Sequence, residues 1–240
     1  KPALRLVRIE PVKDLRQLSL EFPLGPIRQY YDSKPDALIG FILGHEGKGS
    51  LLSKLKAEGL ATSLSAGGAS ETKDYGSFNV NVGLTPAGLK DYPRVLELVF
   101  PAIGKIRAAG YPSHLFRERQ AMARLDETYQ DMGEGTGRAT LLANLLQQYP
   151  FAIAERTPFL WLKEDPAAYQ AILGQLRPDN LLVSLLAKGV TTDQTEPYYG
   201  TRYSYTEDTG AAYASLLNPP AVADISLPEA NPFVPARAAV

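Results

Sequence analysis

Apolar and polar positions alternate along several short stretches of the chain, as they do in strands with one buried face. The clearest case is FNVNV at residues 78–82, where the apolar side chains are separated by asparagines. LSLEF at residues 18–22 alternates in the same way and is expected to end at Pro23 and Gly25. The strands expected are residues 4–9, 18–22, 60–66, 78–82 and 181–187. The third of them should lead into a polar, glycine-rich loop, AGGASETKDYG.

A nearly all-apolar segment, ALIGFILG, predicts a buried helix that a glycine-rich loop breaks. Residues 33–36 resemble a capping box with a proline in the first helical turn. The glycines of GHEGKG, residues 44–49, interrupt the helix because glycine loses much backbone entropy in a helical conformation. SLLSKLKAEG restarts it, with Ser50 as the N-cap and Gly59 just past the end, where the next leucine can fold back onto the helix.

Helical spacing of apolar residues dominates the middle of the chain. Thr85 and Pro86 are expected to open one long helix, kinked at Pro101 and closed by Gly110 and Pro112. Three more helices are expected: one from Ser113 with an apolar stripe reaching Met132, one at residues 139–149 and one at residues 166–176, opened by Asp165 and Pro166.

The order of these elements predicts an α+β fold. We expect a two-layer sandwich in which a mostly antiparallel sheet carries helices on one face. Residues 1–189 should form this domain. Residues 190–240 lose the periodicity and contain several prolines, so they are predicted to be an extended arm of the same domain with little regular structure.

Composition and charge narrow the classes of function. Hydrophobic residues make up 45% of the chain and charged residues 21%, as in ordinary soluble globular proteins. A net charge of −1 indicates no nucleic-acid partner, and no apolar run approaches a membrane span. The chain has no cysteine, which excludes disulfides and thiolate metal sites. It opens at Lys1 without a signal peptide, so we expect a piece of a longer chain.

The loop GHEGKGS has the residues of a metal or phosphate site, but neither interpretation fits. The only histidines are His45 and His114, and the residues four positions after them are Gly49 and Glu118. The zinc motifs H-E-x-x-H and H-x-x-E-H, which need two histidines on one helical turn, are therefore absent. In a phosphate loop a serine or threonine follows the lysine directly, whereas here Gly49 follows Lys48. The residues alone indicate no catalytic or metal-binding site.

Four segments in the same order resemble the second domain of the pitrilysin/insulysin (inverzincin) family of zinc peptidases. They are PDALIGFILGHEGKGSLLSKLKAEGLATSLSAGG, FNVNVGLTPAGL, LRPDNLLV and EPYYGTRY. The resemblance runs in register over residues 15–235 and implies a metallopeptidase/LuxS-like fold. In that family four homologous domains form two bowl-shaped halves around a chamber, and only the first domain carries the zinc motif.

The resemblance implies that this chain is a non-catalytic domain of a zinc metalloendopeptidase. It would wall the chamber, with no cofactor of its own and with zinc in the parent's catalytic domain. The partners implied are a peptide substrate and neighbouring domains, and a bacterial parent is expected in the periplasm. The alternative is a structural subunit, because related domains in mitochondrial processing peptidase and respiratory core proteins act in assembly. An H-x-x-E-H motif upstream in the full gene product would indicate the peptidase, and its absence would exclude the peptidase interpretation.

The resemblance also implies a substrate-anchoring exosite, at which the N-terminus of an extended peptide adds as a strand to a sheet edge. The matching residues are Gly40, Phe41, Gly44, Leu64, Ser65, Ala66 and Gly68. Insulysins have a histidine at the position of Phe41 and a glutamine at that of Gly68, so the polar contacts should differ. The alternative is that these residues only pack a strand–helix junction.

Overall fold

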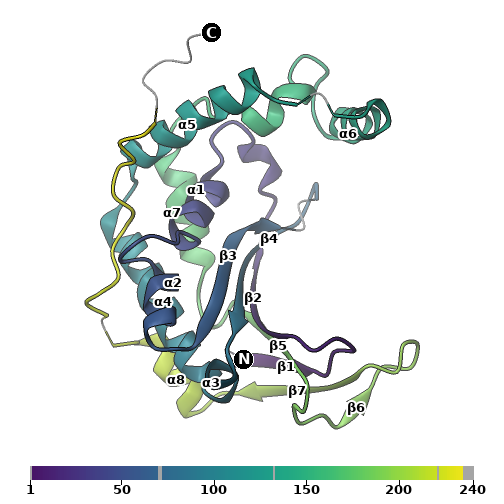
Figure 1. Cartoon of the computed structure of the whole chain (residues 1–240), viewed down its shortest axis with the longest axis vertical. Helices are drawn as coiled ribbons and strands as arrows, with labels where there is room; N and C mark the ends of the chain where they lie inside the picture. The colour runs from purple at the N-terminus through teal and green to yellow at the C-terminus, as the bar shows by residue number, and fades with distance from the viewer. Residues whose placement is uncertain (1, 70–71, 132, 221, 235–240) are drawn as a thin grey trace.

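The computed structural model describes residues 2–69, 72–131, 133–220 and 222–234. Its strands are β1 (Leu4–Ile9), β2 (Arg16–Leu24), β3 (Ala61–Ala69), β4 (Gly76–Leu84), β5 (Leu182–Ala187), β6 (Gln194–Thr195) and β7 (Arg202–Asp208). They form one open sheet of seven strands in the order β3-β4-β2-β5-β1-β7-β6 (Figure 1). The pairing of β1 with β5 is parallel and the other described pairings are antiparallel.

Helices cover one face of this sheet (Figure 1). The helices are α1 (Pro35–Leu43), α2 (Leu51–Ala57), α3 (Pro86–Lys90), α4 (Tyr92–Ala109), α5 (Ser113–Thr128), α6 (Gly135–Gln148), α7 (Pro166–Gln175) and α8 (Ala211–Leu217), with short 3-10 helices η1 (Arg28–Tyr30) and η2 (Ala154–Phe159). α1, α2, α4 and α7 form the layer on the sheet, whereas α5 and α6 make an arm that extends beyond it. The predicted α+β sandwich, with its mostly antiparallel sheet, is confirmed.

The alternation of apolar residues decides which face of the sheet is covered. Leu18, Leu20 and Phe22 of β2 point to the helices and are fully buried. Phe22 meets Phe100 of α4 edge to face, with ring centroids 6.3 Å apart. Burying each such side chain contributes about 1.5–3 kcal/mol, and this contribution holds the two layers together.

The strand β2 runs further than its proline suggested. It was expected to end at Pro23, but it continues to Leu24 and stays paired with β4. Pairing with β5 stops at Glu21, so Pro23 lies past the last β5 partner. A missing N–H is tolerated there as it is on an edge strand.

The expected start of α1 is also wrong in one respect. No capping box forms, because the N-cap is Lys34, whose side chain makes no capping hydrogen bond. Lys34 has φ 44°, the left-handed conformation, and the Ser33 hydroxyl is buried with no hydrogen-bond partner in the described structure. Pro35 does stand in the first turn, as predicted.

The long helix expected after Thr85 is two helices. Thr85 caps α3 as predicted, accepting a hydrogen bond from the Gly88 N–H at 2.9 Å. The chain then breaks at Asp91 (φ −120°, ψ 43°), and α4 begins at Tyr92 with Pro93 in its first turn. A helix running unbroken from α3 would need an N–H at position 93 to bond the Leu89 carbonyl, but Pro93 has no N–H and its ring would clash with that carbonyl. Helix α4 itself continues through Pro101.

Residues 190–240 contain more regular structure than predicted. Within residues 194–217 lie β6, β7 and α8, and β7 pairs along the whole of β1. The expectation of an irregular arm is therefore wrong for this part, because strand pairing with a distant segment overrides the local lack of periodicity.

Residues 222–234, which we call the C-terminal strap, lack helix and strand, in line with the predicted arm. The strap runs along the outside of the helical layer towards α5 (Figure 1). Its Ser226 N–H donates to the Gly49 carbonyl at 2.9 Å, and its Asn231 N–H donates to the Glu118 carboxylate at 3.0 Å. The stripe predicted on α5 reaches Met132, which lies outside the described residues.

Candidate functional site

A pocket lies where α1 meets the edge strand β3, and we call it the α1–β3 pocket. Its volume is about 720 Å³. Every residue predicted for the exosite lines it: Gly40, Phe41, Gly44, Leu64, Ser65, Ala66 and Gly68. The remaining lining residues are Asp36, Ala37, His45, Glu46, Gly47, Gly67 and Arg119. The structure thus brings together two predicted segments about twenty residues apart in the sequence.

The loop after α1 gives the pocket its shape. Helix α1 ends at Leu43 and α2 begins at Leu51, so GHEGKG breaks the helix as predicted. Ser50 caps α2 by accepting a hydrogen bond from the Ser53 N–H at 3.0 Å. Gly49, with φ 78°, supplies a left-handed conformation that other residues adopt only with strain.

The other end of α2 directs the chain into β3. Gly59 has φ 70°, and the Leu60 N–H donates back to the Leu55 carbonyl at 2.9 Å. This arrangement is a Schellman motif, with Gly59 just past the helix end and Leu60 folded back onto the helix as predicted. It reverses the chain directly after α2, so that β3 returns alongside α1.

Two glycines let α1 approach β3 closely. A Cβ atom on Gly40 would lie 2.7 Å from the Ala66 carbonyl oxygen, and one on Gly44 would lie 3.3 Å from the Ala66 nitrogen. Neither neighbour can move away easily, because both are backbone atoms. These glycines therefore allow α1 and β3 to pack closely, which is the role that the alternative interpretation gives them. Because they have no side chains, they also leave the backbone accessible at the pocket.

The edge strand is longer than predicted. It extends to Ala69, so that Gly67 and Gly68 belong to β3 rather than to the following loop. Within the described residues β3 pairs with β4 alone, which leaves its outer side without a strand partner. A row of unpaired backbone groups on such a side can accept an additional strand.

Charged groups that the sequence analysis did not assign also line the pocket. Asp36 and Glu46 contribute carboxylates and Arg119 a guanidinium, while His45 packs beside Phe41 with ring centroids 6.2 Å apart. Asp36 and Glu46 flank predicted residues, so proximity in the sequence could have found them. Arg119 comes from α5, and no local pattern connects it with α1 or β3.

The residues that the structure describes form no group of metal ligands. His45 lies in the α1–β3 pocket and His114 is exposed in the first turn of α5. In the described parts of the chain, no three His, Cys, Asp or Glu side chains are grouped so as to hold a metal ion. A catalytic zinc needs three protein ligands, so the residues described do not fit one. Among the same residues, no helix is long and apolar enough to span a membrane.

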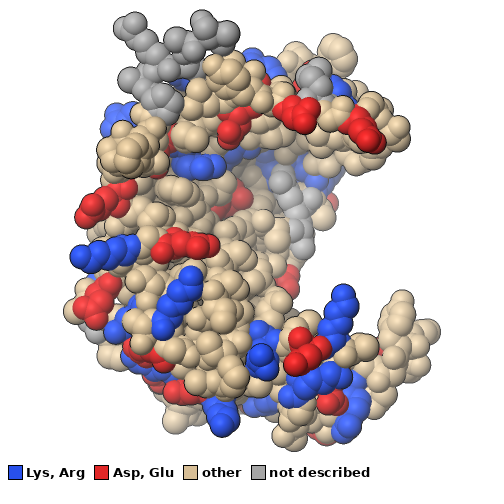
Figure 2. Space-filling model, viewed as in Figure 1, with Lys and Arg blue, Asp and Glu red and all other residues tan. Residues whose placement is uncertain are grey.

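The face of the sheet away from the helices is polar. Ser65, Asn81, Ser19 and Ser184 stand opposite one another on the adjacent strands β3, β4, β2 and β5. The Ser19 hydroxyl donates to the Asn81 side-chain oxygen at 2.7 Å, and Gln17 donates to Ser19 at 2.9 Å. Figure 2 shows that the molecule is hollowed between the α5–α6 arm and the β6–β7 end of the sheet.

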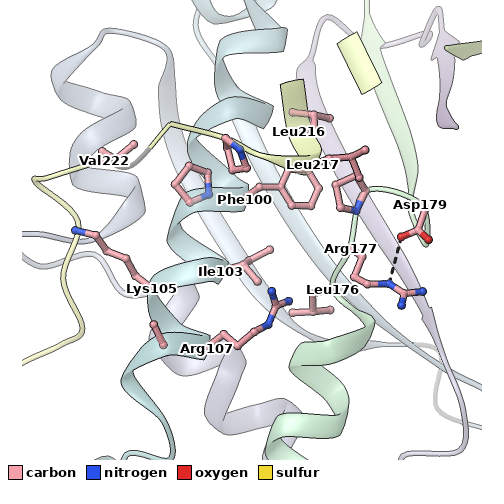
Figure 3. Close-up of a pocket in the computed structure, with 15 residues that line it drawn as sticks. Phe100, Ile103, Lys105, Arg107, Leu176, Arg177, Asp179, Leu216, Leu217 and Val222 are labelled. Carbon is pink, nitrogen blue, oxygen red and sulfur yellow. Dashed lines mark ion pairs between the residues drawn. The ribbon is translucent and has the colours of Figure 1, made fainter. Parts of the chain in front are cut away.

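A second pocket, of about 490 Å³, lies between α4, the segment that follows α7, and α8 (Figure 3). Phe100, Leu176 and Leu217 are among the apolar side chains that line it. At its rim Arg177 and Asp179 form an ion pair, with Nε and Oδ1 3.2 Å apart. None of the residues lining this pocket belongs to a strand, so the α1–β3 pocket beside an edge strand is the better candidate site.

These features define an α+β domain with a pocket at a sheet edge. Residues 2–122 match the family described as "Peptidase M16 inactive domain", and residues 128–240 match "Middle or third domain of peptidase_M16". The chain belongs to the peptidase M16 family. The resemblance to the pitrilysin/insulysin family is thereby confirmed.

Named relatives agree with this assignment. The chain is 31% identical over 233 residues to insulin-degrading enzyme of Homo sapiens, which covers 96% of this chain and 23% of that protein. It is 29% identical over 231 residues to A-factor-processing enzyme of Saccharomyces cerevisiae, covering 96% and 22%. The chain thus spans less than a quarter of the length of these relatives.

Solved structures show the same fold. Pitrilysin matches with a TM-score of 0.92 at 21% identity, over 98% of this chain and 25% of that chain. The first half of the periplasmic protease PqqL from Escherichia coli matches with a TM-score of 0.56 at 12% identity, over 79% and 43%. At these identities the comparison establishes the fold alone.

Proposed function

We propose that this chain is the part of an M16 zinc metalloendopeptidase that walls the cleavage chamber and anchors the N-terminus of the peptide substrate. Zinc and the catalytic residues would belong to another domain of the parent protein, because the described residues do not fit a metal. The neighbouring domains and the peptide are the partners in this proposal, and a bacterial parent would be periplasmic.

One observation carries the proposal: the predicted exosite residues all line one pocket beside an edge strand. A peptide that adds to β3 would satisfy the backbone groups on its outer side, and the small residues Ser65, Ala66 and Gly68 leave room for it. Backbone hydrogen bonds of this kind bind peptides with little dependence on sequence, as a peptidase with varied substrates requires.

The charges of the pocket suit a free N-terminus. An N-terminal ammonium group is a cation, and Asp36 and Glu46 provide carboxylates at the two ends of α1. A peptide antiparallel to β3 would place its N-terminus near the Gly68 end, beside Asp36, whereas a parallel peptide would place it nearer Glu46. Replacing each acid by its amide would show which orientation applies.

The polar face of the sheet supports the chamber-wall part of the proposal. Serine and asparagine side chains in register, rather than apolar ones, make up this face. The sheet borders the hollow that Figure 2 shows. Such a face is stable against water, so it needs no covering helix and can border a solvent-filled chamber.

The alternative is a structural subunit that lacks peptidase function. The packing role of Gly40 and Gly44 favours it, because these glycines have a structural reason to be present even without a ligand. An H-x-x-E-H motif elsewhere in the full gene product would support the peptidase, and its absence would leave the structural subunit.

Amide NMR spectroscopy of this chain tests the anchoring site. A peptide with a free N-terminus should shift the amide signals of residues 64–68, and the same peptide with an acetylated N-terminus should shift them less. Glu46→Gln or Asp36→Asn should remove the difference between the two peptides. Shifts confined to other residues, or equal shifts by both peptides, would contradict the proposal.

A further inference from the structure

Arg119 occupies an unusual position in the α1–β3 pocket. Its guanidinium carbon lies 5.1 Å from the centre of the Phe41 ring and 5.8 Å from that of the Trp161 ring. The two rings come from α1 and from the segment before α7, and Phe116 packs against Trp161 with ring centroids 5.5 Å apart. Aromatic faces attract a guanidinium and restrict its plane, so Arg119 is held in place before any ligand arrives.

The charge of Arg119 is not neutralised by the described residues. Arg94, Arg156 and Arg177 each form an ion pair with a carboxylate. In the described parts of the chain Arg119 has ring contacts but no such pair. An aromatic ring covers the face of a guanidinium and leaves the N–H groups at its edge accessible. These N–H groups can donate two parallel hydrogen bonds to one carboxylate.

The charges of the pocket follow an order along α1. Asp36 stands at one end, where a Cβ on Gly68 would touch its carboxylate, and Glu46 stands past the other end. Phe41, whose ring contacts the Arg119 guanidinium, lies between them. A peptide along β3 would therefore meet an acid at its amino terminus, in either orientation, and a cation further along.

We propose that Arg119 makes the α1–β3 pocket selective for peptides that carry an acidic side chain a short distance after a free N-terminus. The inference rests on the proposed peptide-anchoring function and names the substrate class that the same pocket prefers. The carboxylate of Asp or Glu would receive hydrogen bonds from the Arg119 guanidinium while the peptide backbone pairs with β3.

The geometry of a strand limits where this acidic residue can stand. Successive side chains of a strand point to opposite faces of the sheet. In β3, Leu64 is buried towards the helices, whereas Ser65 stands in the polar row of the other face. Only every second side chain of an added peptide would point to the helical side, where α1 and Arg119 lie. The preference should therefore alternate along the peptide.

Binding of short fluorescent peptides to this chain tests the inference. One series has a free N-terminus and a single Glu moved one position at a time, and the matched series has Gln at the same position. We expect Glu to bind roughly fivefold tighter than Gln at alternate positions in low salt, with the difference shrinking as salt is added. Arg119→Gln should abolish this difference between the Glu and Gln peptides.

Two variants serve as controls. Arg117→Gln makes the same change on an exposed residue of α5 outside the pocket, and it should keep the preference. Arg119→Lys keeps the charge without the planar fork, and it should keep a reduced preference. Equal binding of Glu and Gln peptides by the unsubstituted chain would overturn this inference alone. Loss of all peptide binding in Arg119→Gln would also overturn this inference. Failure of the unsubstituted chain to bind any peptide would instead overturn the proposed function.

Discussion

Gly40 shows how one absent side chain determines the geometry of the pocket. A Cβ at this position would lie 2.7 Å from the Ala66 carbonyl oxygen and 2.8 Å from the Gly67 Cα, both backbone atoms. We expect Gly40→Ala to lower the free energy of unfolding by about 1–3 kcal/mol, because α1 must move away from β3. Urea unfolding followed by circular dichroism would measure this.

The matched control for Gly40→Ala is Gly104→Ala, in the interior of α4. Apart from its chain neighbours and the adjacent backbone of α4, no atom of the described residues lies within 4 Å of the Cβ that alanine would add there. This substitution should raise the free energy of unfolding by about 0.5–1 kcal/mol, because alanine loses less backbone entropy than glycine in a helix. If both variants gained stability, the close contact of α1 with β3 would be refuted.

Glu58 supplies a prediction about pH. Arg94 donates to both its carboxylate oxygens, at 2.9 and 3.1 Å, and these hydrogen bonds lower the pKa of Glu58 below its ordinary value of 4.5, against the opposing effect of burial. A lowered carboxyl pKa contributes stability above pH 4.5 that is lost as pH falls through the lowered pKa.

Glu58→Gln should therefore be less stable than the unsubstituted chain at neutral pH, and the difference should shrink below pH 4.5. Unfolding curves across this range would measure it, with the exposed residue Asp14, changed to Asn, as the control. A difference that stayed constant with pH would show that the lost interaction is not the ion pair with Arg94.

At the scale of single elements, α2 is the one whose two ends follow most directly from the sequence. Ser50 caps its start and Gly59 ends it, as local patterns predicted. Ser50→Ala should cost about 1 kcal/mol of unfolding free energy, because the Ser53 N–H loses its acceptor.

Ser53→Ala is the matched control for this cap. It removes a hydroxyl from the same helix but keeps the N–H that Ser50 accepts, so it should change stability by less than the cap variant. Thermal unfolding of both variants measures the difference. Equal losses would mean that the cap contributes nothing beyond the loss of a hydroxyl.

Other elements could not be predicted from local patterns. The apolar spacing of residues 85–109 is continuous, yet the backbone breaks at Asp91 ahead of Pro93. The strand β7 has weak periodicity and forms because β1 offers it a partner almost two hundred residues earlier in the chain. Stability of such a strand comes from cross-strand contacts, which a local window of sequence does not contain.

At the scale of the whole molecule, the chain should not bind zinc tightly on its own. Its histidines are on different elements, and the described residues offer no group of three ligands. Isothermal titration with zinc should show no stoichiometric tight site, and the same titration of His45→Ala would identify any weak binding at the pocket. One tight site per chain would contradict the assignment as a non-catalytic domain.

The sequence by itself determined the strands with alternating burial, the caps of α2, the helix break at GHEGKG and the absence of a zinc motif. These are properties of adjacent residues, so short-range backbone preferences and spacing are enough to specify them. Its resemblance to a family also indicated the seven predicted exosite residues, which all line one pocket.

Only the tertiary structure decided what completes that pocket. Arg119 reaches it from α5 and contacts the Trp161 ring, which comes from still further along the chain. The strand β3 is an edge because of the order in which the seven strands pair. Packing between distant segments depends on the shape of the whole core, and no local pattern records it. The contact of the Arg119 guanidinium with two aromatic rings, from which the preference for acidic peptides is inferred, results from that packing.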